Sequence, residues 1–204
     1  MAIAAPPLGR PPRVDVTPEE REQLLALARL AVRAAAHGTA ESARKAALEA
    51  IDDRPSREPR RGAAFVTLLR HGELRGCVGL LDPSRPLTES VTGAAIAAAV
   101  QDWRFEPVTA AELPELDVAI SVLGPLVSLD DPTSFRLGVD GLLLERGTDR
   151  GLLLPEVATE HGLGTLAMLE AVSRKAGLPG DAWRLPGTHV SAFRTTRFGG
   201  PALG

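Results

Sequence analysis

Residues 63–81 read AAFVTLLRHGELRGCVGLL, and this stretch indicates the fold class. Two β-prone runs, 63–70 and 74–81, flank the dipeptide His71-Gly72. A two-residue connection between such runs predicts a β-hairpin, whose returning strand carries Cys77. The stretch therefore favours antiparallel β-structure over the parallel strands of βαβ units.

Helical segments lie on both sides of this hairpin. Thr17-Pro18-Glu19-Glu20 forms a capping box with proline at the first helical position, and it predicts a helix that ends at Gly38. Further helices are expected over 40–51, 87–101, 155–160 and 165–176. Further strands are expected within 117–129, where Gly124-Pro125 interrupts the pattern, and over 137–146, 151–154 and 189–198. Hairpin-joined strands mixed with several helices predict an α+β fold rather than a doubly wound parallel sheet.

Composition narrows the class of protein. The 204 residues are 44% hydrophobic but only 3% aromatic, so the core must consist of Leu, Val, Ile and Ala. The net charge of -3 provides no general attraction to nucleic acid, and we expect no nucleic-acid partner. A single cysteine excludes an internal disulfide framework and a thiolate-rich zinc site, so neither a metal nor a cofactor is predicted.

The N-terminal residues 1–15 are rich in proline and are predicted to be a disordered tail, followed by one domain over residues 16–200. The tail lacks the basic and apolar regions of a signal peptide. No run approaches the roughly 18 apolar residues of a membrane helix. These features predict a soluble, cytoplasmic protein.

Cys77 is the main candidate for a functional residue. In a regular strand Arg75 and Cys77 share one face, and Leu74, Gly76 and Val78 share the other. A guanidinium beside a thiol lowers the thiol pKa, so Arg75 is expected to activate Cys77, while Gly76 and Gly79 leave room for a substrate. The alternative is that Cys77 is a small buried hydrophobic residue, as free cysteines often are, and that the glycines mark a β-bulge.

Asp102 and Arg104 follow the predicted helix 87–101 and lie in a turn. With Arg75 they could bind a polar or anionic substrate, or they could form a structural pair that holds the turn against the sheet. Trp103 and Phe105 could stack on a base, but in an acidic protein with few aromatic residues they are expected to be core anchors. His71 is interpreted as a turn residue rather than a general base.

The run Leu74-Arg75-Gly76-Cys77-Val78-Gly79 resembles the signature of the AMMECR family, with Val78 where Ile is commoner. Other segments agree in order, among them Phe65-Val66-Thr67-Leu68, Asp102–Val108 with Trp103 in place of proline, and Lys175–Leu178. The resemblance spans roughly residues 17–198. It implies an α+β domain with a mainly antiparallel sheet flanked by helices and a smaller attached subdomain. By analogy it also implies a role beside Memo-like and radical SAM proteins.

Two functional hypotheses remain open. In the first, the chain is an enzyme or an enzyme subunit that uses Cys77 in covalent chemistry, with Arg75 as activator and with Gly76, Gly79, Asp102 and Arg104 around the substrate. In the second, the same residues shape a non-catalytic site for a small ligand or a protein partner. Neither hypothesis identifies the reaction or the ligand.

Overall fold

The computed structural model describes residues 10–52 and 60–200. The chain divides into two compact units. The larger unit combines Asp15–Leu123 with the chain from Thr196, and the smaller unit combines Gly124–Thr195 with the chain up to Val14. Each contains an antiparallel sheet and helices, so the predicted α+β class with a smaller subdomain is confirmed. The single domain over residues 16–200 stays a prediction.

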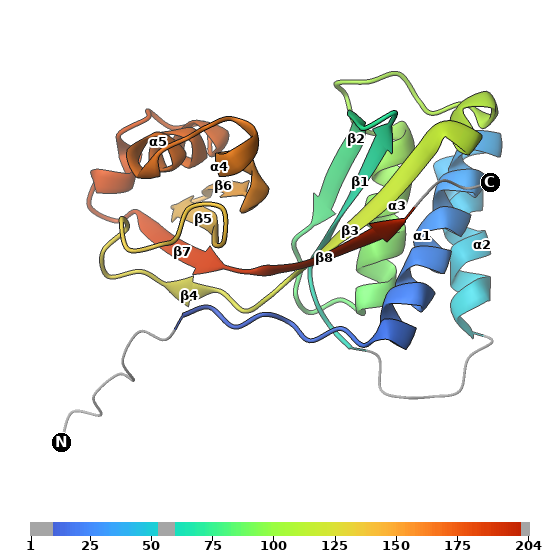
Figure 1. Cartoon of the computed structure of the whole chain (residues 1–204), viewed down its shortest axis with the longest axis horizontal. Coiled ribbons are helices and arrows are strands. Elements are labelled where there is room, and N and C mark those ends of the chain that lie inside the picture. Colours follow the sequence, from blue (N-terminus) through green and yellow to red (C-terminus); the bar gives the residue numbers. More distant parts are fainter. Residues whose placement is uncertain (1–9, 53–59, 201–204) are drawn as a thin grey trace. The chain divides into compact units, whose positions relative to one another are not determined.

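The sheet of the larger unit has the strand order β2 (Glu73–Leu80), β1 (Ala64–Arg70), β3 (Leu116–Leu123) and β8 (Thr195–Gly200), as Figure 1 shows. β1 pairs antiparallel with both β2 and β3. The predicted hairpin is confirmed: the turn residues His71 and Gly72 have φ values of 54° and 82°. Two successive positive φ values are typical of the turn whose twist matches a β-hairpin.

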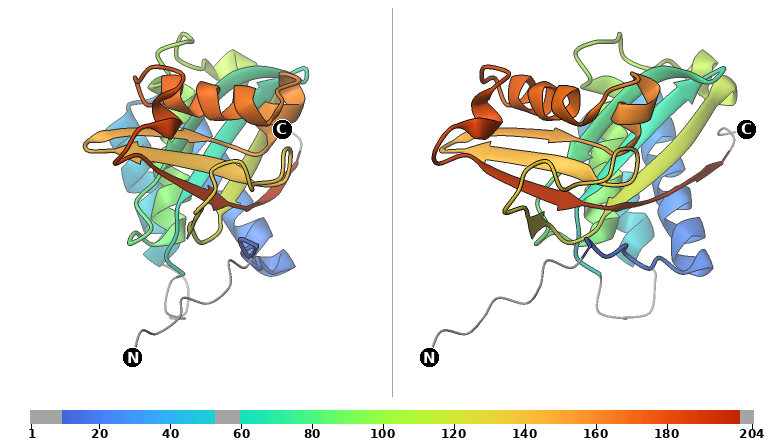
Figure 2. Two further views of the ribbon diagram at one scale, coloured as in Figure 1. Left: turned by 90° about the vertical axis from the view of Figure 1, so that its left-hand side faces the viewer. Right: turned by 60° about the vertical axis from the view of Figure 1, so that its left-hand side comes forward.

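Helices α1 (Pro18–His37) and α3 (Leu87–Val100) cover one face of this sheet, and α2 (Ala40–Asp52) packs on these two helices (Figures 1 and 2). α1 begins as predicted, because the Thr17 hydroxyl accepts the Glu20 backbone N–H at 3.2 Å. Val66, Leu68 and Ile120 point to the helices and are fully buried. A 3₁₀ helix, η1 (Ala110–Glu115), leads from α3 into β3.

The opposite face of the sheet carries Cys77. Because side chains alternate along each strand, the register places Thr67 beside Cys77 and Ala119 beside Thr67 on this face. Leu69 pairs with Leu74 and with Asp117 in the neighbouring row. We call this surface the thiol face and define it by six residues: Thr67, Leu69, Leu74, Cys77, Asp117 and Ala119.

The smaller unit has a second antiparallel sheet in the order β4 (Val127–Ser128), β7 (His189–Phe193), β5 (Gly141–Arg146) and β6 (Asp149–Leu153). Its helices are α4 (Glu156–Glu160), α5 (Thr165–Lys175) and the 3₁₀ helix η2 (Ala182–Arg184). α5 packs on β5 and β6, and Leu142, Leu144, Met168 and Leu169 form the fully buried centre of this core. No helix among the described residues is both long and apolar enough to cross a membrane.

One predicted element differs from the structure. The expected strand 189–198 is two strands, β7 and β8, which belong to different sheets. The chain changes sheets at Arg194, whose carbonyl accepts the Gly124 N–H at 2.7 Å and whose guanidinium binds the buried Asp140 at 3.1 Å. Residues 1–9 of the predicted tail and most of the predicted loop 53–62 lie outside the described residues, whereas Pro11 within the tail is buried.

Candidate functional site

The thiol of Cys77 lies beside a buried hydroxyl. Cys77 is directly opposite Thr67 on β1, and its Sγ is 3.4 Å from Oγ1 of Thr67, within hydrogen-bonding distance for sulfur. Thr67 is only 6% exposed, whereas Cys77 has intermediate exposure. The sulfur is therefore held in place from the inner strand, and the residue as a whole is partly exposed.

The backbone of Cys77 is fixed by the Asp102–Arg104 pair. β2 is the edge strand of its sheet. The Cys77 N–H donates to Oδ2 of Asp102 at 2.9 Å, and Nη2 of Arg104 donates to the Cys77 carbonyl at 3.2 Å. The two side chains thus satisfy backbone groups that a further strand would otherwise bind, which is one way that proteins protect a sheet edge. Both predicted residues lie beside Cys77, and these contacts are structural.

Asp102 and Arg104 also bind each other. Arg104 donates through Nη2 to Oδ2 at 2.6 Å and through Nε to Oδ1 at 2.9 Å. The hydrogen bonds from Arg104 have the largest effect on the pKa of Asp102, and the bond from the Cys77 N–H adds to it. Together they lower this pKa to about 2, although burial opposes the shift. The same pairing raises the pKa of Arg104. Both members of the pair are therefore ionised at neutral pH. Asp102 carries this charge although only 7% of the residue is exposed.

The electrostatics of Cys77 differ from the sequence-based expectation. Burial raises the pKa of the Cys77 thiol, and this effect outweighs the hydrogen bond from Thr67 and the charges of Arg104 and Arg197, which lower it. A negative charge on Asp102 also raises it. The thiol is therefore protonated at neutral pH, and Arg75 is not among the main influences on its pKa.

Arg75 has a different partner. Its Nε and Nη2 bind the two carboxylate oxygens of Glu112 in η1 at 2.8 Å and 3.2 Å. This fork, aided by bonds from Thr109, lowers the pKa of Glu112 to about 2. The expected activation of Cys77 by Arg75 is corrected here, because the Arg75 guanidinium is engaged in a bidentate pair with Glu112.

A β-bulge explains where Arg75 points. Leu68 pairs with Gly76 and Leu69 pairs with Leu74, so Arg75 is an extra residue in β2 without a partner on β1. The bulge also places Leu74 on the same face as Cys77, whereas strict alternation had predicted opposite faces. Glycines in a strand often mark a bulge, and Gly76 follows Arg75, but the sequence does not say which residue is extra. The expected face of Leu74 is wrong for this reason.

The two glycines beside Cys77 make room for other parts of the protein. A Cβ atom on Gly76 would lie 2.2 Å from the carbonyl oxygen of Ala98, so α3 contacts the strand backbone there. A Cβ atom on Gly79 would lie 2.4 Å from the ring of Phe65, which covers that position. The predicted role of both glycines in substrate binding gains no support from this geometry, because protein atoms occupy the space they leave.

The aromatic residues after α3 separate into two environments. Phe105 is half-buried, with the Arg104 guanidinium 5.4 Å and the Arg75 guanidinium 6.0 Å from its ring centroid. Trp103 is 92% exposed, so its expected role as a core anchor is wrong. Asp102 and Arg104, on either side of Trp103, hydrogen-bond each other, and Asp102 also accepts the Cys77 N–H. The indole between them lies in solvent.

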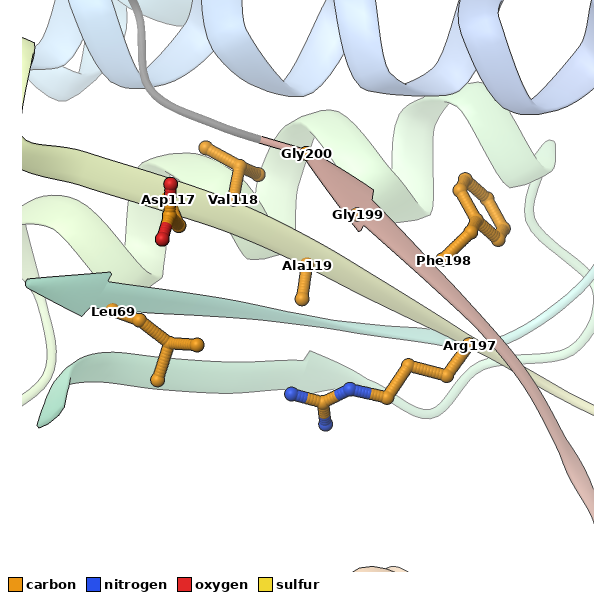
Figure 3. A pocket seen from close by; sticks show the side chains of 8 residues that line it. All are labelled: Leu69, Asp117, Val118, Ala119, Arg197, Phe198, Gly199 and Gly200. Carbon is orange, nitrogen blue, oxygen red and sulfur yellow. The ribbon is translucent and has the colours of Figure 1, made fainter. Parts of the chain in front are cut away.

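A hollow of about 460 Å³ adjoins this face of the sheet. It is lined by Leu69 of β1, by residues 117–119 of β3 and by residues 197–200 of β8. Figure 3 shows Leu69, Ala119 and Arg197 pointing to the same side of the sheet, while Val118 and Phe198 point to the helices. Sequence reasoning missed Thr67, Asp117 and Arg197, because only the strand pairing brings Thr67 beside Cys77 and places Asp117 and Arg197 along one hollow.

The other candidates lie apart from this group. His71 sits in the hairpin turn, where its Nε2 is 3.2 Å from the Glu115 carboxylate, consistent with its interpretation as a turn residue. Among residues 10–52 and 60–200, no set of three or more His, Cys, Asp or Glu side chains is placed to hold a metal ion.

Comparisons with known proteins agree on one family. The model of the AMMECR1 family matches residues 25–198. A protein from Methanothermobacter thermautotrophicus is 41% identical over 186 residues, which cover 88% of this chain and 94% of that protein. Protein TK0174 from Thermococcus kodakarensis is 42% identical over 164 residues, covering 76% of this chain and 80% of the relative. The crystal structure of the uncharacterized protein PH0010 from Pyrococcus horikoshii matches with a TM-score of 0.74 and 33% identity, over 92% of this chain and 94% of that one.

Proposed function

The chain belongs to the AMMECR1 family, and from this premise we propose that its thiol face is a binding site for a small molecule. The observation that carries the proposal is the arrangement of three features on one sheet: the Cys77 thiol, the Thr67 hydroxyl beside it and the hollow over β1, β3 and β8. Small-molecule sites typically combine an apolar surface with a few polar groups at fixed positions.

The state of the thiol favours binding over nucleophilic attack. The thiolate is the reactive form of cysteine, and burial raises the pKa of Cys77. A protonated thiol next to a hydroxyl can instead donate a hydrogen bond to a ligand or accept one from it. The Asp102–Arg104 pair supports this function, because its hydrogen bonds fix the backbone of Cys77.

Binding can be tested by filling the hollow. Leu69 lines the hollow and is partly exposed, so Leu69→Trp adds bulk there with little disturbance of the core. Leu166→Trp is the matched control, because Leu166 is 51% exposed on α5 of the other unit. Small acids, amines and neutral amides would be screened by ligand-observed NMR against the wild-type protein and both variants.

We expect molecules that bind the wild-type protein to lose binding to Leu69→Trp and to keep it in the Leu166→Trp control. If no molecule of the set binds, or if Leu69→Trp binds as well as the wild type, the small-molecule proposal is wrong. Circular dichroism checks that both variants fold. If Leu69→Trp does not fold, the smaller change Ala119→Leu at the same hollow replaces it.

A second candidate function is covalent chemistry at Cys77, in an enzyme or in a subunit of one. It is favoured by the charges of Arg104 and Arg197, both of which act to lower the pKa of Cys77. The alkylation rate of Cys77 against pH distinguishes the two candidates. A rate that titrates below the pKa of a free thiol supports catalysis, and a rate that rises only above it supports the binding site.

A protein partner is the third candidate, and the exposed Trp103 favours it, because exposed tryptophans often anchor protein interfaces. The Memo-like and radical SAM partners implied by the family resemblance stay predictions, as do the cytoplasmic location and the absence of a nucleic-acid partner. A loss of binding of Trp103→Ala to a purified Memo-like or radical SAM protein would support this candidate, and unchanged binding would contradict a role of the indole.

A further inference from the structure

The hollow next to the thiol face is charged at two places. Of its eight lining residues, Arg197 is the one cation and Asp117 is the one anion. In Figure 3 the Arg197 side chain extends from β8 past β3 toward β1, on the side to which Ala119 and Leu69 point. Asp117 lies farther along β3, so a positive and a negative group line different parts of one hollow.

Arg197 also acts on the thiol. Its positive charge is one of the influences that lower the pKa of Cys77, which places the guanidinium and the sulfur within electrostatic range of each other. Arg197 and Cys77 come from strands at opposite edges of the sheet. A long side chain that spans the inner strands therefore connects the hollow with the Cys77–Thr67 pair.

The hollow also has apolar side chains in its lining. Leu69 and Ala119 form its apolar part. These two side chains thus provide a short aliphatic surface on the side of the sheet to which Arg197 points.

We propose that the ligand of this face is a small organic monoanion, a monocarboxylate with a short aliphatic body, whose carboxylate binds Arg197. This inference rests on the proposed small-molecule site. A guanidinium matches a carboxylate with two parallel hydrogen bonds. Leu69 and Ala119 contact the aliphatic body, and Asp117 disfavours a second negative charge at the other end.

The charge of Asp117 is the reason for a carboxylate rather than a phosphate ester. A phosphate monoester carries between about one and a half and two negative charges at neutral pH. The excess charge would lie in the same hollow as the Asp117 carboxylate, where like charges repel. The volume of about 460 Å³ falls within the range of small-molecule sites.

The test uses 3-methylbutanoate as the probe and its neutral isostere 3-methylbutanamide as the matched control. Each is titrated into the ¹⁵N-labelled full chain at constant ionic strength, and amide shifts are followed by NMR. We expect the acid to shift the amides of residues 117–119 and 197–200 and to bind at least about tenfold more tightly than the amide. Arg197→Gln should remove this difference, and Arg197→Lys should retain part of it.

Arg150→Gln is the control for a general loss of positive charge, because Arg150 is an exposed arginine of β6 in the other unit. It should leave binding of the acid unchanged. Succinate should bind more weakly than 3-methylbutanoate, and Asp117→Asn should reduce that discrimination.

Each outcome decides between the proposals. Equal shifts by the acid and the amide, no shifts by the acid, or full binding of the acid by Arg197→Gln would overturn the ligand class. If neutral molecules bind and are displaced by Leu69→Trp while acids do not, the small-molecule site stands and the monoanion inference fails. If nothing binds the face, both fail.

Discussion

Replacement of Asp102 by asparagine tests whether the Asp102–Arg104 pair stabilises the edge strand β2, which carries Cys77. Both oxygens of the carboxylate accept hydrogen bonds: Oδ2 from the Cys77 N–H and Oδ1 from Nε of Arg104. In either orientation an asparagine side chain directs its NH₂ group at one of these donors. The change therefore keeps the shape and removes both the charge and one acceptor.

The expected loss follows from the pKa of Asp102, which falls from the usual 3.8 to about 2. This difference corresponds to about 2 kcal/mol of preferential interaction with the ionised carboxylate. Only 4% of the Asp102 side chain is exposed, whereas 40% of the Arg104 side chain is, so solvent screens part of the interaction through Arg104. We expect Asp102→Asn to lower the free energy of unfolding by about 2 kcal/mol at neutral pH.

The loss should depend on pH in a defined direction. A carboxyl group with a lowered pKa stabilises the folded state when it is ionised. Its contribution is complete above 3.8 and disappears as the pH falls through about 2. The difference in stability between the wild type and Asp102→Asn should therefore be constant from neutral pH to the usual pKa of aspartate and then shrink in stronger acid.

Urea unfolding followed by far-ultraviolet circular dichroism measures this difference, and hydrogen exchange of the Cys77 amide reports the same contact locally. Asp181→Asn is the matched control, because Asp181 is exposed and makes no side-chain cap bond at η2. A loss below about 0.5 kcal/mol, the usual effect of a neutral surface change, would refute the reasoning. So would a loss that does not vary with pH, or unchanged exchange of the Cys77 amide.

Three further predictions concern the same region. Glu112→Gln breaks the bidentate ion pair with Arg75, so it should lower the free energy of unfolding by about 2–3 kcal/mol at neutral pH. In urea titrations this loss should disappear as the pH falls from 4.5 to about 2, and a loss that does not vary with pH would contradict the prediction. Gly76→Ala places a Cβ atom 2.2 Å from the Ala98 carbonyl oxygen, so it should lower the free energy of unfolding by more than about 2 kcal/mol. The control Gly164→Ala, whose Cβ atom would have nothing within 4 Å, should change the urea midpoint little. Equal effects of the two changes would argue against the close approach of α3. Thr67→Val removes a hydrogen bond that lowers the pKa of Cys77, so iodoacetamide should alkylate Cys77 more slowly at a fixed alkaline pH, and a faster rate would show that the hydroxyl does not support the thiolate.

Much of the fold was predictable because its signals are local. The Thr17 N-cap and the His71-Gly72 turn depend on residues within one turn of chain, and they are confirmed by a hydrogen bond and by backbone angles. The strand 189–198 was predicted as one element because its β propensity is continuous. Only pairing with two different sheets divides it, and local propensity carries no information about that pairing.

The candidate site was predictable in its residues but not in their contacts. Cys77, Asp102 and Arg104 were all singled out, and the structure brings them together. Arg75 was assigned to Cys77 by strand alternation, but the bulge at Arg75 directs its guanidinium to Glu112. Simple counting from the turn would place Val66 opposite Cys77. The bulge shifts the register by one residue and places Thr67 there instead.

The sequence by itself determined the α+β class, the antiparallel hairpin, the helix starts and the prominence of Cys77, because capping, turn conformation and hydrophobic period depend on residues close in the chain. The tertiary structure alone decided the protonation state of the thiol, the partner of Arg75 and the hollow that includes Arg197. Those properties depend on burial and on groups up to 120 positions apart in sequence, such as Cys77 and Arg197. Strand pairing brings such groups together, and no local pattern encodes the resulting distances and charges.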